Sequence, residues 1–184
     1  MLSQTTLDLL RKFDWQTIID FGNSLDDLND SQWRFLKGLV VELAVESKSF
    51  TDLQYVGEEH KDYNWPSQNL TVELKSQFIL SIYTARGKLR KTFNIKFNNA
   101  NGETKTQLAA DQVADMLLVV RSDGAFAVDR NTVIAKAKKA GDGFVVRLTP
   151  SDVTMIAGPL QKTHTFCPNL KESVKSIIRQ SLPA

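Results

Sequence analysis

The chain has 184 residues, 42% hydrophobic and 24% charged, which is typical of one domain with a sizeable buried core. Its 23 basic and 21 acidic side chains give a net charge of +2, which excludes a histone-like excess, so any nucleic-acid binding must come from local clusters of charge. The single cysteine, Cys167, excludes an internal disulfide framework, and no secretory signal or apolar run of ~20 residues occurs, so we expect a cytoplasmic protein without a membrane partner.

The first part of the chain, residues 1–48, is patterned for helices. Apolar residues recur at intervals of three and four from residue 3 onward, most clearly in 31–47. Asp30 or Ser31 is the predicted N-cap of that helix. Because this part is rich in apolar positions for its length, we expect it to contribute to a dimer surface.

The sequence then becomes polar and afterwards alternates. Residues 49–69 contain the breakers Gly57 and Pro66, and we expect an irregular loop there. Strict alternation of apolar and polar residues predicts strands at 70–76 and 92–97.

The second half of the chain mixes both patterns. Residues 106–114 are predicted to form a short helix, and the nearly continuous apolar run 116–120 predicts a central strand buried on both faces. Glycine-containing turns at 122–124 and 141–143 lead into further extended segments, and a capping-box-like start predicts a C-terminal helix over 168–182. The predicted fold is an α/β or α+β domain with a central mixed β-sheet flanked by helices.

A glutamate followed two positions later by lysine occurs four times, but only one of these pairs lies on a predicted strand. Glu73 and Lys75 would point to the same face of that strand, about 7 Å apart. One of the other three pairs lies at a helix end, where residues two apart do not face each other, and the remaining two lie in a polar loop and in a turn. An acidic loop that contains Glu59 and Asp62 immediately precedes the strand.

These residues have a chemical use together. Mg²⁺ prefers carboxylate oxygens, waters and phosphate oxygens, so Asp62 and Glu73 could hold it with the Leu74 carbonyl, and Glu59 could add a carboxylate. Such a metal polarises a phosphate and acidifies a bound water, and Lys75 is placed to orient or deprotonate that water and to offset negative charge. The alternative is a solvated strand face whose charges pair with cross-strand neighbours.

The spacing of these residues is similar to that of a known active-site motif. Glu73-Leu74-Lys75-Ser76, with Asp62 eleven positions before Glu73, resembles the active-site motif of the PD-(D/E)xK nuclease superfamily. Lys61 stands where the name of the motif has proline. The likeness is greatest to the type II restriction endonucleases, whose glycine- and glutamate-rich loop is similar to 55–62 and whose central strands are similar to 116–129.

The resemblance implies a restriction-endonuclease-like core and a Mg²⁺-dependent, sequence-specific endonuclease acting on double-stranded DNA as a homodimer. It implies that Asp62 and Glu73 bind the metal and that Lys75 assists the attacking water. We accordingly expect one nuclease domain over 1–184, with its catalytic core at 50–135. No GxxxxGK[ST] motif occurs, so no nucleotide cofactor is expected. A DNA repair or junction-resolving nuclease, a non-catalytic DNA-binding domain and a scaffold without a nucleic-acid role remain alternatives.

Clustered cations follow the predicted catalytic strand and would neutralise backbone phosphates. The alternative interpretation is a solvated hairpin edge protected by lysines. A second basic stretch, 135–143, is interpreted as a solubilising surface. The candidate DNA-binding residues are Arg86, Lys88, Arg90, Lys91 and Lys96.

Overall fold

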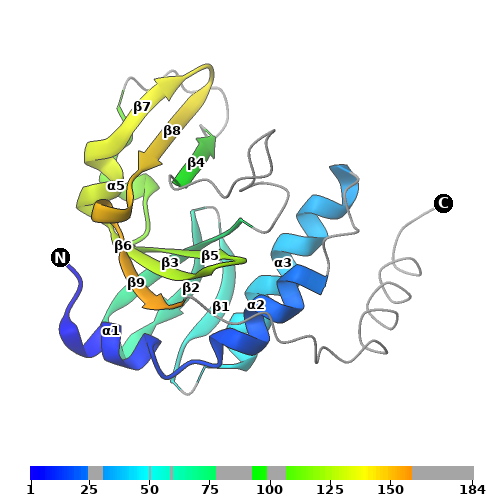
Figure 1. Cartoon of the computed structure of the whole chain (residues 1–184). Helices are drawn as coiled ribbons and strands as arrows, with labels where there is room; N and C mark the ends of the chain where they lie inside the picture. The colour runs from blue at the N-terminus through cyan, green and yellow to red at the C-terminus, as the bar shows by residue number, and fades with distance from the viewer. Residues whose placement is uncertain (25–30, 50, 59, 78–92, 99–106, 159–184) are drawn as a thin grey trace.

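The computed structural model describes residues 1–24, 31–49, 51–58, 60–77, 93–98 and 107–158. These residues form an α+β fold with four helices and two sheets (Figure 1). The C-terminal helix predicted at 168–182 lies outside the described residues.

Three helices occupy the first part of the chain, as the apolar spacing predicts. They are α1 (Gln4–Leu10), α2 (Trp15–Ser24) and α3 (Ser31–Ser47). The predicted cap Asp30 lies outside the described residues, and Ser31 is the first residue of α3. None of the helices in the described ranges is long and apolar enough to cross a membrane.

A six-stranded mixed sheet forms the centre of the molecule. All neighbouring strands are antiparallel except β3 and β5, which are parallel. The strands predicted at 70–76 and 116–120 are both present and adjacent. In spatial order the strands are β1 (Gln54–Glu58), β2 (Lys61–Trp65), β3 (Leu70–Gln77), β5 (Met116–Arg121), β6 (Gly124–Asp129) and β9 (Thr154–Ala157).

Strand β5 is buried on both faces, which explains its continuous apolar sequence. Met116 and Leu118 belong to the core cluster that contains the residues of α1, α2 and α3. Leu117 and Val119 belong to a second cluster on the opposite face. The sheet is therefore covered by helices on one side and by another layer on the other.

That other layer contains a separate three-stranded antiparallel sheet, which sequence patterning does not predict. Its order is β4 (Phe93–Asn98), β8 (Gly143–Leu148), β7 (Ala137–Ala140), and α5 (Arg130–Lys136) leads into it. In Figure 1 it stands apart from the six-stranded sheet. The alternating apolar residues of β4 and β8 pack into the second cluster with Leu117 and Val119. The strand predicted at 92–97 is thus real but belongs to this second sheet.

The prediction of an irregular loop over 49–69 is wrong. Strands β1 and β2 form an antiparallel hairpin there, with a bulge between Tyr55 and Glu58. The buried Tyr63 and Trp65 alternate with polar residues, but the strand is too short for this period to stand out against its polar composition.

The helix predicted at 106–114 is also wrong. In the described part of this range, the only helical element is a single 3₁₀ turn at Ala110–Gln112. Gln112, Val113 and Ala114 are buried consecutively, which one face of an amphipathic helix does not allow.

Candidate active site

The pairing of β2 with β3 ends next to the predicted catalytic residues Asp62 and Glu73. Tyr63 pairs with Val72, and one further step in this register would bring Asp62 opposite Glu73. The Asp62 side chain itself links the two strands here, because its Oδ2 accepts a hydrogen bond from the Leu74 backbone N–H at 2.6 Å. Asp62 therefore lies in strand β2 and not in the predicted loop, and it is held directly against β3.

Glu73 and Lys75 share one face of β3, as period-two geometry predicts. The Lys75 Nζ donates a hydrogen bond to Glu73 Oε1 and forms an ion pair with it. Glu73 is only 4% exposed, whereas the Lys75 side chain is 34% exposed. The second oxygen, Glu73 Oε2, is buried and has no hydrogen-bond partner among the described residues. Leaving such an oxygen unpartnered costs about 1–3 kcal/mol, so this position favours a cation or a donor.

A third carboxylate, Glu42 on α3, belongs to the same group. Its side chain accepts a hydrogen bond from the Tyr55 hydroxyl, and the Tyr63 hydroxyl donates to the Glu42 backbone carbonyl at 2.8 Å. These contacts fix α3 against the β1–β2 hairpin. Sequence reasoning missed Glu42 because nothing in the pattern distinguishes it from Glu46, one turn later on the same helix.

Burial and mutual repulsion disfavour ionisation of all three carboxyl groups. Burial raises the pKa of Asp62 to about 6, and the nearby Glu73 charge adds to this, while the Leu74 N–H and Lys75 oppose it. Burial also raises the pKa of Glu73, against the opposing effect of Lys75. The pKa of Glu42 is raised by burial and then by Asp62. Among the described residues, the Lys75 ammonium thus faces three carboxyl groups, which favours the approach of a divalent cation.

A cleft of about 370 Å³ opens over this group. Glu73 does not line it, because its side chain is buried and bound to Lys75. The cleft is lined by Gly38, Leu39, Glu42, Tyr55, Gly57, Asp62, Leu74, Lys75 and Ser76.

A larger cavity of about 600 Å³ lies at the other end of β3, where Leu70 and Asp115 line it. Its two carboxylates, those of Asp115 and Asp129, already accept hydrogen bonds. Asp115 Oδ2 accepts from the Thr71 N–H and hydroxyl, both at 2.8 Å, and Oδ1 pairs with Arg130 at 2.8 Å. This arrangement is typical of a structural link between strands, so we place the candidate site in the smaller cleft.

The other residues proposed from the sequence are only partly placed by the structure. Lys96 is exposed on β4. Glu59, Arg86, Lys88, Arg90 and Lys91 lie outside the described residues.

The donor set at this cleft fits Mg²⁺ better than a metal with many protein ligands. Within the described ranges, no group of three or more His, Cys, Asp or Glu side chains is arranged to hold a metal ion. Mg²⁺ needs fewer protein ligands, because it binds through one or two carboxylates and takes its remaining ligands from waters and phosphate oxygens. Asp62 lines the cleft, and Glu73 lies outside its lining with an Oε2 that is buried and has no hydrogen-bond partner among the described residues, so these two carboxylates are the ones available to meet that smaller requirement.

Comparison with known proteins identifies no relative of this chain. No protein-family model, curated protein or solved structure was found to match the chain. The function must therefore be argued from the geometry of the site and from its chemistry.

Proposed function

We propose that the chain is a Mg²⁺-dependent endonuclease that hydrolyses phosphodiester bonds of double-stranded DNA, as a type II restriction enzyme. The observation that carries the proposal is the convergence of Asp62 with Glu73 and Lys75 where the pairing of β2 with β3 ends. An ordinary solvated strand face would leave the glutamate in water, but Glu73 is 4% exposed with one unpartnered oxygen. A buried, unevenly satisfied group of charges is more typical of a catalytic site.

Each residue has a role in this proposal. Asp62 and Glu73, with the Leu74 carbonyl, would hold Mg²⁺, and the chemistry that the metal would supply is polarisation of a phosphate and acidification of water. Lys75 orients or deprotonates the attacking water and offsets the charge that develops on the phosphate. Val72 and Leu74 are buried in the helix-side core, so β3 presents these groups from a rigid element.

Cleavage of palindromic DNA by a restriction enzyme implies a homodimer, which places one active site on each strand. A DNA repair or junction-resolving nuclease would use the same catalytic group on a different substrate. The cleavage pattern separates these forms, because only a restriction enzyme gives fixed fragments from long linear DNA.

The first prediction concerns metal-dependent cleavage. Purified protein incubated with long natural DNA is expected to give discrete fragments in Mg²⁺. Cleavage is expected to be absent in EDTA and in the Lys75→Ala variant, because each removes one of the charges that stabilise the transition state. Gel electrophoresis of the three reactions provides the measurement.

The gel also distinguishes the alternatives. Nicking, or cutting confined to branched DNA, would keep a nuclease but assign it to repair or junction resolution. Intact DNA in every reaction, repeated on several DNAs and with Mn²⁺, would contradict the proposed activity and return Glu73 and Lys75 to a structural role.

The second prediction concerns Glu42. If its charge helps to attract the metal, Glu42→Gln should raise the Mg²⁺ concentration for half-maximal cleavage by about tenfold, since ~1.4 kcal/mol is a modest interaction between charges in a partly buried site. Rates measured across a Mg²⁺ titration test this.

Glu46→Gln is the matched control, because Glu46 lies one turn further along α3 and accepts from the Tyr55 N–H at 2.7 Å. It should leave the titration unchanged. An equal effect of both substitutions would show that Glu42 acts only by fixing the helix.

A further inference from the structure

Three cations, one from β4 and two from the β7–β8 hairpin, lie on one face of the three-stranded sheet. The register pairs Lys96 of β4 with Val145 of β8, and Val145 with Lys138 of β7. Arg147, two residues after Val145, therefore points to the same side of β8. All three basic side chains are exposed, while the opposite face of the sheet carries the apolar residues of the second core cluster.

These three side chains, Lys96, Lys138 and Arg147, are termed here the basic face, and no acid among the described residues pairs with them. By contrast, Lys136 pairs with Asp152 at 2.8 Å. The only acidic residue in 137–148 is Asp142, in the β7–β8 turn. A surface built for solubility would mix both signs.

The sheet that carries this basic face adjoins the candidate active site. Gln77, the last residue of β3, donates from Nε2 to the Asn94 carbonyl of β4 at 2.7 Å. The Lys75 Nζ lies 5.9 Å from the centre of the Phe97 ring. Phe97 follows Lys96 in β4 and therefore points to the opposite, apolar face of the sheet. The basic face therefore lies on the side of the second sheet that is turned away from Lys75, and a polyanion reaches both only if it extends past β4.

We propose that the basic face binds the sugar-phosphate backbone of duplex DNA away from the bond that is cut, where the duplex extends past β4. Strands are about 4.8 Å apart, so Lys96 and Lys138 are separated by about 10 Å across β8. A duplex carries one charge for every ~1.7 Å of its axis, so a face of this width meets several phosphates. The inference rests on the proposed function for the identity of the substrate, and it replaces the interpretation of 135–143 as a solubilising surface.

The test is the salt dependence of DNA binding. A variant with Lys96→Gln, Lys138→Gln and Arg147→Gln is compared with the wild type in EDTA, on a duplex of defined length, by fluorescence anisotropy from about 50 to about 300 mM salt. Loss of three phosphate contacts should reduce the slope of log affinity against log salt by about 2 to 3 and weaken binding about 10- to 100-fold at the lowest salt. Asp142→Asn should act in the opposite direction and strengthen binding.

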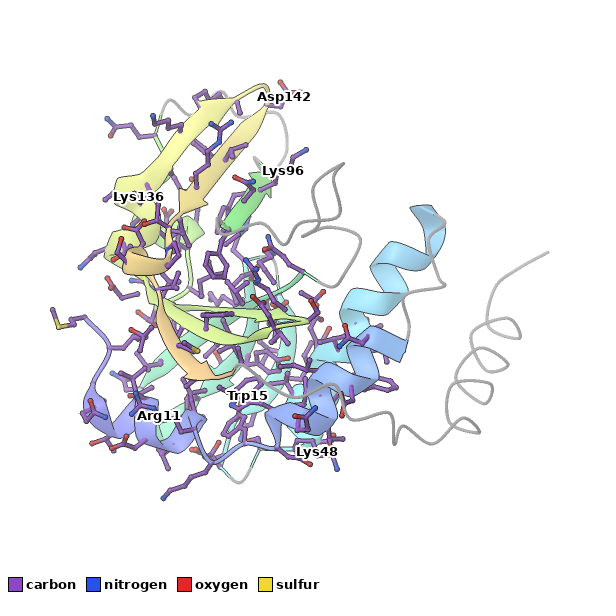
Figure 2. All side chains as sticks on the ribbon, viewed as in Figure 1. Arg11, Trp15, Lys48, Lys96, Lys136 and Asp142 are labelled. Atoms are coloured by element: carbon purple, nitrogen blue, oxygen red, sulfur yellow. The ribbon has the colours of Figure 1, made fainter. Side chains whose placement is uncertain are left out.

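A charge-matched control carries Arg11→Gln, Lys12→Gln and Lys48→Gln. Figure 2 shows Arg11 and Lys48 at the end of the molecule opposite Lys96. The control should keep the wild-type slope. Equal slopes for the wild type and the basic-face variant, or equal losses in both triple variants, would overturn the inference.

Failure of this inference and failure of the proposed function are distinguishable. Binding is read without metal, so a chain that binds duplex DNA through the basic face but does not cut it in Mg²⁺ would refute the nuclease and support the inference. A chain that cuts DNA but binds it equally well without the three cations would do the reverse.

Discussion

A Glu73→Gln variant is expected to cleave DNA at least about a thousandfold more slowly than the wild type while remaining folded. Mg²⁺ bound by a carboxylate contributes several kcal/mol to phosphoryl-oxygen polarisation, and ~4 kcal/mol corresponds to a factor of about a thousand in rate. The amide keeps an oxygen that can accept from Lys75 and removes a charge whose ionisation burial disfavours, as the raised pKa of Glu73 indicates. The measurement is the single-turnover cleavage rate with protein in excess over DNA.

Glu58→Gln provides the control for this rate. Glu58 lies on β1 with a side chain that is 60% exposed, and its ion pair with Lys61 is on the surface, so the same chemical change should leave cleavage unaltered. If Glu73→Gln cleaved at the wild-type rate while circular dichroism showed both variants to be folded, Glu73 would have no part in the reaction.

The parts of the fold that the sequence predicts are those whose pattern is local. Helix α3 spans the predicted 31–47 because its apolar spacing is regular over several turns. Strand β5 is predicted by a short apolar run, because a strand that is covered on both faces needs apolar side chains at successive positions. In each case the information lies within the segment itself.

The parts that the sequence does not predict depend on which segments meet. Strands β4 and β8 alternate clearly, but alternation gives only the face of a strand and not its partner, so their separation into a second sheet is not encoded in the period. The β1–β2 hairpin was missed for a different reason. His60 has a φ of 65° and Gly57 a φ of 61°, and such turn and bulge positions break the alternation that marks longer strands.

The residues of the candidate site also fall into those that a local pattern predicts and those that only the fold brings together. Glu73 and Lys75 are found from spacing on a single strand, and their shared face is observed. Asp62 is found from the acidic composition of its segment, but it lies on a strand and not in the predicted loop. The hydrogen bond that it accepts from the Leu74 N–H depends on the pairing of β2 with β3. Glu42 is 31 positions from Glu73 and joins the group only because α3 packs over the hairpin.

The free-energy cost of burying the Asp62 charge leads to a prediction about stability. Burial raises the pKa of Asp62 from its ordinary value of 3.8 to about 6, so between these values the folded chain binds more protons than the unfolded chain. Stability from this group is therefore fully present below pH 3.8 and is lost as the pH rises through about 6. A displacement of about two pH units corresponds to about 3 kcal/mol, reduced to about 1–2 kcal/mol because water reaches part of the cleft.

Asp62→Asn is accordingly expected to stabilise the protein at neutral pH in EDTA, even though it should abolish cleavage. The amide oxygen can still accept from the Leu74 N–H, while the costly charge is removed. The melting temperature should rise by about 2–8 °C at about pH 7.5, with no gain near pH 4. Differential scanning calorimetry across this pH range provides the measurement.

Asp52→Asn is the control of opposite sign. Asp52 accepts from the Ser67 N–H at 2.7 Å and from the Ser67 hydroxyl at 2.6 Å, and these bonds, with the hydroxyl the larger cause, lower the pKa of Asp52. Its ionised form is favoured in the fold, so its replacement should not stabilise the protein at neutral pH. If Asp62→Asn also failed to stabilise, or stabilised equally near pH 4, burial and the Glu73 charge would not disfavour the ionised form of Asp62 in the fold. The attraction that the carboxylates around the cleft offer to a divalent cation would then have lost its physical basis.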